Sequence, residues 1–207
     1  WFADNYLVAG LDMIAQLGMM MMPLGEGLNA PPSNEDIARV IVGTLINPAL
    51  HIGKTYRPTG PKLLSPPQMA DVFGRVLGRK VRYQDMPMWL FSKVARSVGL
   101  PDFQTAQVMW YLEEYRRNAF GVGAPTNAVL EVGGQEPEDF ETIVRRYVAT
   151  APNMKRNVSD FSRTLLNLMK IMFTPTLNVD RFARAHDLPR IVNMRLAVDS
   201  LEWQSTH

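Results

Sequence analysis

Apolar residues recur at helical spacing through most of the chain, with shorter apolar runs between these segments. The helical period predicts helices over residues 6–17, 33–47, 66–77, 87–98, 103–118 and 138–149. The short runs at 19–22, 55–58, 81–84 and 128–132 are typical of strands. Strands and helices alternate up to about residue 84, and helices dominate beyond it. This order predicts an α/β layer followed by a smaller, mostly helical lobe.

The segment 65–78 carries the clearest local signals in the chain. Ser65 is a good helix cap, Pro66 suits a first helical turn, and Gln68 stands where it completes a capping box. Gly78 then ends the helix. One apolar face is expected to pack inward: Met69, Val72, Phe73, Val76 and Leu77.

A second helix is expected to begin at Ser33 and to end at Asn47. Its buried stripe would consist of Ile37, Val40, Ile41 and Leu45. Asp36 lies in the first turn, where an acidic group interacts favourably with the helix dipole. We interpret Asp36 as such a dipole and capping residue, in preference to one that orients a loop of a binding pocket.

The character of the chain changes at residue 151. A strongly apolar helix face follows, formed by Phe161, Leu165, Leu168, Met169 and Met172, and two shorter elements are expected around 179–186 and 190–201. We therefore divide the chain into an α/β unit over residues 1–150 and a helical extension over residues 151–207. The apolar face at 161–172 is a candidate surface for a protein partner or for homo-oligomerisation.

Composition excludes several classes of function. The 207 residues carry a net charge of +2 without a basic block, so nucleic acid is not an expected ligand. Cysteine is absent, which excludes thiolate catalysis and cysteine-based zinc sites and fits a cytoplasmic location. The three histidines lack ligand spacing, so we predict no metal site. No apolar run approaches the ~20 residues that span a bilayer.

Four segments resemble NmrA-like proteins, which are atypical short-chain dehydrogenase/reductase relatives that bind NAD(P). Residues 2–7, Phe-Ala-Asp-Asn-Tyr-Leu, are similar to the aromatic-x-x-Asn segment of that family. Residues 23–25 with 34–38 resemble its loop and Asp-Ile-Ala helix. Residues 56–81 resemble its Thr-Gly-Pro, Leu-Ser and Leu-Gly-Arg run, and residues 133–140 its Gly-x-x-Pro-x-x-Phe segment. The order and spacing of these motifs cover residues 1 to about 148.

The resemblance implies the C-terminal, substrate-side half of a Rossmann-like NAD(P)-binding fold, with a small, mostly helical substrate lobe. By the same resemblance, Phe2 and Asn5 would lie at the nicotinamide end of the cofactor site, and Trp1, Met22 and Met86 would line the substrate pocket. Two alternatives remain open. Asn5 could instead cap a helix that begins at Tyr6, and the aromatic residues could belong to the core.

The glycine-rich turn that binds dinucleotide phosphates in such folds has no match in this chain. We expect that half of the site either upstream of Trp1 or missing, because the chain opens on Trp-Phe-Ala-Asp-Asn like the middle of a protein.

The resemblance implies an NAD(P)H-dependent oxidoreductase acting on a small organic substrate such as a quinone or a carbonyl compound. The chain has no Tyr-x-x-x-Lys sequence, because Gly60 and Pro87 stand four residues after Tyr56 and Tyr83. A built-in catalytic Tyr/Lys pair is therefore not supported, and no catalytic residue is assigned. The alternative is a protein that senses NADP without turnover, or an accessory subunit of a larger assembly.

Overall fold

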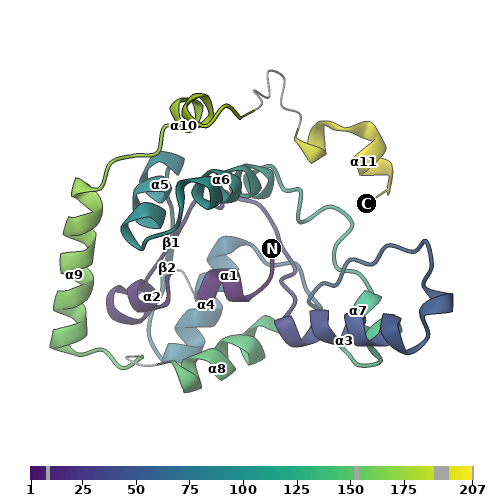
Figure 1. Cartoon of the computed structure of the whole chain (residues 1–207). Helices are drawn as coiled ribbons and strands as arrows, with labels where there is room; N and C mark the ends of the chain where they lie inside the picture. Colours follow the sequence, from purple (N-terminus) through teal and green to yellow (C-terminus); the bar gives the residue numbers. More distant parts are fainter. Residues whose placement is uncertain (8–9, 152–153, 189–195, 207) are drawn as a thin grey trace.

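A two-stranded parallel sheet lies near the centre of a mostly helical structure (Figure 1). The computed structural model describes residues 1–7, 10–151, 154–188 and 196–206. The strands are β1 (Met19–Met22) and β2 (Arg82–Asp85), paired in register from Met19 opposite Arg82 to Met22 opposite Asp85. The expected α/β layer is therefore present as a small parallel sheet.

The helices fall into three groups. Around the sheet lie α1 (Asp4–Leu7), α2 (Leu11–Leu17), α4 (Pro66–Leu77), α5 (Met88–Ser97), α6 (Asp102–Arg116) and α8 (Phe140–Thr150). At one end, α3 (Asn34–Ile46) continues into the short 3-10 helix η1 (Pro48–Leu50) and packs on α7 (Ala128–Gly133). The C-terminal helices are α9 (Val158–Phe173), which packs on α2 and α5, α10 (Val179–Ala185), and the pair η2 (Ala197–Asp199) and α11 (Leu201–Thr206). Asp199 of η2 is bound to Arg117 after α6, so this pair lies apart from α9 (Figure 1).

Helix α4 has both ends where the sequence predicts them. The Ser65 hydroxyl accepts a hydrogen bond from the Gln68 amide at 3.4 Å, and the Gln68 side chain accepts one from the Ser65 amide at 2.8 Å. Gly78 closes the helix in a left-handed conformation with φ of 63°. Met69 and Phe73 are fully buried, so the expected apolar face does form part of the core.

Replacing Ser65 by alanine is expected to lower the free energy of unfolding by about 1 kcal/mol, because one amide of the first turn loses its partner. Urea unfolding followed by circular dichroism measures this change. Ser162→Ala, an exposed position inside α9, is the control and should be neutral or slightly stabilising. Equal effects of the two substitutions would contradict a capping role for Ser65.

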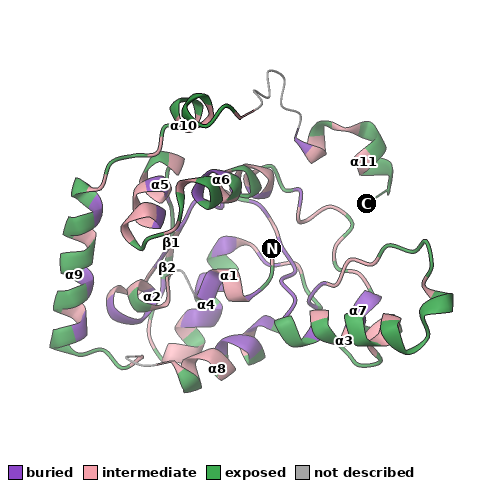
Figure 2. Ribbon diagram, viewed as in Figure 1, coloured by how far each residue is buried: buried purple, intermediate pink, exposed green. Residues whose placement is uncertain are grey.

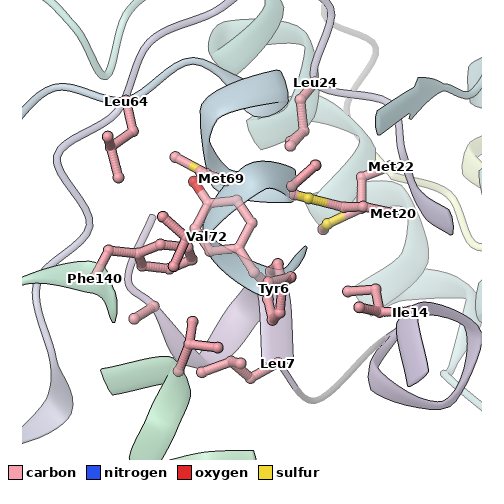
Figure 3. Packing of buried hydrophobic residues seen from close by; sticks show 14 of the residues in the cluster. Tyr6, Leu7, Ile14, Met20, Met22, Leu24, Leu64, Met69, Val72 and Phe140 are labelled. Atoms are coloured by element: carbon pink, nitrogen blue, oxygen red, sulfur yellow. The ribbon is translucent and has the colours of Figure 1, made fainter. Parts of the chain in front are cut away.

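The core joins α1, α4, α8 and the sheet. Figure 2 shows buried residues on the elements around the sheet, and Figure 3 shows Tyr6, Met20, Met22 and Phe140 packed in one cluster. Tyr6 meets Phe140 edge-on at 5.8 Å, and Phe140 meets Phe73 in the same way at 5.9 Å. This cluster fixes the first residues of the chain against the strands.

Two predicted strands are wrong. Residues 55–58 form no strand, and their polar groups are bound by side-chain contacts instead: the Arg57 guanidinium donates to the carbonyls of Phe120 and Val122, and the Thr126 hydroxyl donates to the Arg57 carbonyl. Residues 128–132 lie in the helix α7, which Gly134 closes in a left-handed conformation. The run Ala-Val-Leu-Glu-Val is too short for periodicity to separate a strand from a helix.

The expected buried stripe of α3 is also wrong in part. Val40 is buried, but Ile41 and Leu45 are 54% and 70% exposed. The reason is the close crossing of α3 and α7: a Cβ on Gly43 would lie 2.0 Å from the Val132 carbonyl oxygen. The side of α3 that faces the protein is therefore the one with Val40 and Gly43.

The other expected elements map as follows. The helix predicted over residues 6–17 falls on α1 and α2, with residues 8 and 9 outside the described part of the chain. Of the element expected at 190–201, residues 190–195 lie outside the described part, and the remainder carries η2 and the start of α11. The apolar face of α9 is divided, because Leu165, Met169 and Met172 are about half exposed or more. Within the described residues, no helix has both the length and the apolar character needed to cross a bilayer.

Candidate functional site

A buried hydrogen-bond network attaches the first residues of the chain to the loop after β1 and to α6. The Asn29 side chain donates to the Trp1 carbonyl at 2.6 Å and to the Tyr6 hydroxyl at 2.8 Å. The Tyr6 and Tyr115 hydroxyls are hydrogen-bonded to each other at 2.9 Å. Both phenols are fully buried. Asn29 therefore holds Trp1 directly, and Tyr6 links this segment to α6 through Tyr115.

Both phenols of this network are neutral. Burial, reinforced by the neighbouring Tyr115, raises the pKa of Tyr6 well above its ordinary value. Burial likewise raises the pKa of Tyr115. Because neither hydroxyl ionises near neutral pH, the pair acts as a hydrogen-bonded support and not as a base.

Of the expected substrate-side residues, Met22 ends β1, Met86 directly follows β2, and Trp1 packs against two buried tyrosines. The Trp1 ring packs edge-on against Tyr6 and Tyr115, with ring centroids 6.3 Å apart in both pairs, and it joins the same apolar cluster as Met22. The Met86 amide donates to the Met22 carbonyl at 3.3 Å. This hydrogen bond joins the two methionines at the carboxyl ends of the two strands. Both side chains are almost fully buried. Trp1 and Met22 thus belong to the same core cluster, and Met86 adjoins Met22 through the backbone.

Phe2 and Asn5, the expected cofactor residues, share one turn of the chain. The Asn5 amide donates to the Phe2 carbonyl at 3.1 Å. Phe2 is 39% exposed, and the partly buried side-chain amide of Asn5 makes no hydrogen bond to the described residues. Helix α1 begins at Asp4, so Asn5 lies inside the helix and the alternative that it caps a helix beginning at Tyr6 is wrong.

A polar cavity opens at the carboxyl ends of the two strands. It has a volume of about 620 Å³ and is lined by Gly25, Glu26, Pro67, Tyr83, Asp85 and Arg116. In open parallel sheets, ligands bind outside the carboxyl ends of the strands. The position of this cavity therefore fits a ligand site, although Trp1, Met22 and Met86 are not among the residues that line it.

Asp85 organises the polar side of this cavity. One carboxylate oxygen accepts from the Gly25 amide at 3.0 Å, and Arg116 donates to both oxygens at 2.9 and 3.0 Å. The Tyr83 hydroxyl lies 2.9 Å from the same carboxylate and 3.1 Å from the Met22 carbonyl. The sequence pattern did not reveal this cluster, although the position of Asp85 at a strand end was a signal that could have pointed to it.

The same contacts set the ionisation of the cluster. Burial by itself would raise the pKa of Asp85, but hydrogen bonds from Gly25, Arg116 and Tyr83 outweigh it and hold that pKa below its ordinary value. Burial, followed by the hydrogen bond to Asp85 and its negative charge, raises the pKa of Tyr83 well above its ordinary range. At neutral pH the cavity therefore presents an ionised carboxylate paired with Arg116, beside a neutral phenol.

Two further residues considered in the sequence analysis, Tyr56 and His186, have hydrogen-bond partners of their own. The Tyr56 hydroxyl is hydrogen-bonded to His51 at 2.7 Å, and neither residue belongs to the segments that form the network or the cavity. His186 is hydrogen-bonded to the Phe182 carbonyl of its own helix end. Among the described residues, no group of three His, Cys, Asp or Glu side chains is placed to hold a metal ion.

Several known proteins are similar to this chain over part of its length. No family model matches the chain. It is 32% identical over 102 residues to the NAD(P)H azoreductase of Xenophilus azovorans and 30% identical over 102 residues to quinone oxidoreductase 2 of Escherichia coli. Each match covers 49% of this chain and 35% of the relative, so the matched segment spans about a third of the curated relatives' length.

The structural comparison covers more of the chain. The crystal structure of an NADPH-dependent quinone oxidoreductase from Escherichia coli, complexed with NADPH, superposes with a TM-score of 0.59 at 23% identity. That superposition covers 70% of this chain and 50% of the other. It shows that the fold matches part of an NADPH-binding protein of the Rossmann type.

These matches confirm the resemblance that the sequence motifs predict. The chain is a distant homologue of the NmrA-like group of atypical short-chain dehydrogenase/reductases, the group of the quinone oxidoreductase and the azoreductase.

Proposed function

We propose that this chain forms the substrate-side half of an NAD(P)H-dependent oxidoreductase that reduces a small organic acceptor such as a quinone or a carbonyl compound. The observation that carries the proposal is the pair formed by Phe2 and Asn5. An exposed aromatic ring and an amide without a partner among the described residues lie in one turn, directly after Trp1 in the sequence. The homology to a quinone oxidoreductase and an azoreductase supports the same reaction class.

The residues present fit one end of a dinucleotide. An asparagine amide both donates and accepts hydrogen bonds, so Asn5 matches a carboxamide such as that of nicotinamide. The Phe2 ring offers an apolar face for a flat heterocycle. We therefore assign the nicotinamide end of the cofactor to these two residues.

The phosphate end of the cofactor does not fit the described residues. A pyrophosphate site of this fold needs a strand, a glycine-rich turn and a helix N-terminus in immediate succession. After β1, the next helix of the described chain, α3, begins twelve residues later at Asn34. After β2 only Met86 and Pro87 precede α5, and neither is a glycine. No residue of the described part is assigned to the phosphates.

The chain's own residues would then shape the reaction site and exclude water from it. A bound reduced nicotinamide would supply the hydride for the acceptor. Trp1, which is only partly buried, would meet a flat organic substrate, and the almost fully buried Met22 and Met86 would exclude water from behind it. The Asn29 side chain keeps Trp1 in position by donating a hydrogen bond to the Trp1 carbonyl. The polar cavity with Asp85 and Arg116 would take the polar part of the substrate.

The proposal also keeps the division of the chain and its location in the cell. Helix α8 ends at Thr150 and α9 begins at Val158, which supports a boundary near residue 150 between the cofactor-binding unit and a helical extension. We place the protein in the cytoplasm, as its lack of cysteine suggests.

The first test is NADPH binding and turnover by the purified protein and its Asn5→Ala variant. We expect wild-type protein to bind NADPH and to oxidise it with quinones. Asn5→Ala should raise the Kd for NADPH about five- to tenfold, the equivalent of one hydrogen bond of ~1 kcal/mol. Without cofactor its melting temperature should be unchanged, because the amide has no partner among the described residues to lose. Isothermal titration calorimetry and thermal unfolding measure the two effects.

Asn34→Ala is the matched control, because Asn34 is an exposed first-turn asparagine on a different helix. Its Kd for NADPH should equal that of the wild type. Absence of NADPH binding by the wild-type protein would sink the cofactor assignment. An equal loss of affinity in both variants would remove Asn5 from the site.

The second candidate function is a protein that binds NADP as a signal, or as an accessory subunit, without turnover. The absence of a Tyr-x-x-x-Lys sequence favours it. Steady-state NADPH oxidation with a panel of quinones and carbonyl compounds separates the two. Tight binding without turnover on the whole panel would replace the oxidoreductase by the sensor.

A further inference from the structure

An aliphatic face of α3 and η1 is exposed on the surface at one end of the molecule. It consists of Ile41, Val42, Leu45, Ile46, Leu50 and Ile52, whose side chains are 54–82% exposed. Figure 2 shows this region of α3 and the segment after it as exposed. We call these six residues the aliphatic face. It is the side of α3 opposite the contact with α7.

Such a surface is unusual for a protein that stays alone in water. Contiguous apolar patches of more than a few hundred Å² mark binding surfaces. The six aliphatic residues lie within one short stretch of sequence and each is more than half exposed, which corresponds to an area on the order of several hundred Å². Within the described residues, the other side of α3 packs on α7, so this face is left free.

We propose that a second copy of this chain covers the aliphatic face, with the two α3 helices antiparallel across a two-fold axis. The distribution of charge around the face allows this arrangement. No Asp, Glu, Lys or Arg occurs from Val40 to Gly53, so two copies can meet here without repulsion between like charges. The half-exposed Glu35 lies at the start of α3, where it pairs with Arg146, and the exposed Lys54 follows the far end of the face.

An antiparallel pair uses these two end charges in a complementary way. The symmetry places Glu35 of each copy near Lys54 of the other copy, so the same attraction occurs twice. It also sets the helix dipoles in opposite directions, which is favourable for neighbouring helices. A parallel pair would instead bring like charges together at both ends.

The apolar area that two copies would bury is also sufficient for a stable interface. A stable interface between two proteins buries at least about 1,000 Å² in total, counted over both partners. Several hundred Å² of aliphatic surface on each copy, doubled by the symmetry, reaches this limit. The interface would be apolar at its centre and charged at its ends, as stable interfaces are.

The exposed side of α9 is a poorer surface for self-association. It also carries apolar residues, among them Met169 and Met172, but the charges on this helix beside them are those of Arg163 and Lys170. The acidic residue of α9, Asp160, is buried and already paired with Arg163. Lys170 therefore places a charge, bound to the Ser97 carbonyl, within the apolar side of α9, whereas no charged residue interrupts the face on α3, which favours the latter as the homo-oligomer surface.

The decisive experiment measures molecular mass in solution by size-exclusion chromatography with light scattering. We expect wild-type protein to have twice the mass of one chain and Leu45→Glu to have the mass of one chain. Leu45 is 70% exposed, so the charge should not disturb the fold of the monomer, and circular dichroism checks this. Met172→Glu, at an apolar position of α9 that is 65% exposed, is the control and should remain dimeric.

Two outcomes would overturn the proposal. One is a wild-type protein that stays monomeric at its highest soluble concentration. The other is a dimer that Met172→Glu dissociates and Leu45→Glu leaves intact. Neither result depends on NADPH, so this test is independent of the proposed function.

Cysteine trapping tests the geometry. The chain has no cysteine, so a single introduced thiol can pair only with its symmetry mate. Leu45→Cys, near the middle of the face, should form a disulfide-linked dimer on oxidation, because a two-fold axis brings central residues next to their own copies. Ala38→Cys, an exposed position toward the start of α3, should not. A dimer trapped through Ala38→Cys would contradict the antiparallel arrangement.

Discussion

Gly27→Ala is expected to lower the free energy of unfolding by about 3 kcal/mol or more, a cost typical of severe overpacking. A Cβ at Gly27 would lie 2.0 Å from the Tyr115 carbonyl oxygen and 2.9 Å from the carbonyl carbon and a ring carbon of the same residue. Gly27 has no left-handed φ, so the effect comes from this close approach alone. The loop after β1 would have to move away from α6.

The surroundings leave little room for such a movement. Tyr115 is fully buried, and its hydroxyl is bound to Tyr6. The Leu28 amide, next to Gly27, is bound to the Asn118 side chain at 2.9 Å. Since Asn29 holds Trp1 from the same loop, displacement of the loop should also weaken the proposed site.

Urea unfolding followed by circular dichroism measures the loss of stability, and Gly78→Ala provides the control. Gly78 has a left-handed φ of 63°, but a Cβ at this position would have no described neighbour within 4 Å, so only backbone strain is added there. That strain costs about 1–2 kcal/mol. If Gly27→Ala costs no more than Gly78→Ala, the loop is not held tightly against α6.

Sequence reasoning succeeded where the determinants are local. Helix α4 begins and ends as expected because its capping box and its closing glycine lie within the segment itself. The strand of four methionines, β1, was found from an apolar run ended by a proline and a glycine. In both cases neighbouring residues decide the structure.

Reasoning from the sequence failed where distant contacts decide. Ile41 and Leu45 have the spacing of a buried stripe, but the crossing with α7 turns a different side of the helix inward. A helical period shows that an apolar face exists and does not show what covers it. The exposed face of α3 is therefore both a wrong prediction from the sequence and the basis for the proposed dimer.

The candidate site divides in the same way. The family motifs placed Trp1, Phe2 and Asn5 in one segment, and the structure shows what surrounds each of them. The network of Asn29, Tyr6 and Tyr115 could not be predicted, because Tyr6 and Tyr115 are 109 residues apart in sequence. A tyrosine at an apolar helical position looks like an ordinary core residue until its hydroxyl partner is known.

Asp36 shows how burial changes the meaning of a common pattern. Its position in the sequence indicates a first-turn dipole and capping residue. In the structure its side chain is completely buried, with one oxygen 2.6 Å from the Arg39 guanidinium and the other accepting from the Glu138 amide at 3.0 Å. It therefore joins the start of α3 to the chain that leads into α8.

Asp36→Ala is accordingly expected to lower the free energy of unfolding by about 3 kcal/mol, because it leaves both partners of a buried carboxylate unsatisfied. Asp36→Asn should cost less, since an amide oxygen can still accept from Glu138. Urea unfolding of the three proteins measures the series.

Glu35→Gln is the matched control for Asp36→Ala. Glu35 is the neighbouring first-turn acid, its side chain is 50% exposed, and it pairs with Arg146 at the surface. Both substitutions remove one negative charge from the same helix end, so they share the loss of dipole interaction. An exposed ion pair adds little, and Glu35→Gln should cost only about 0.5–1 kcal/mol. The excess in Asp36→Ala is then the contribution of the buried link between α3 and α8. If the two costs are equal, Asp36 acts only through the helix end, as its position in the sequence suggests.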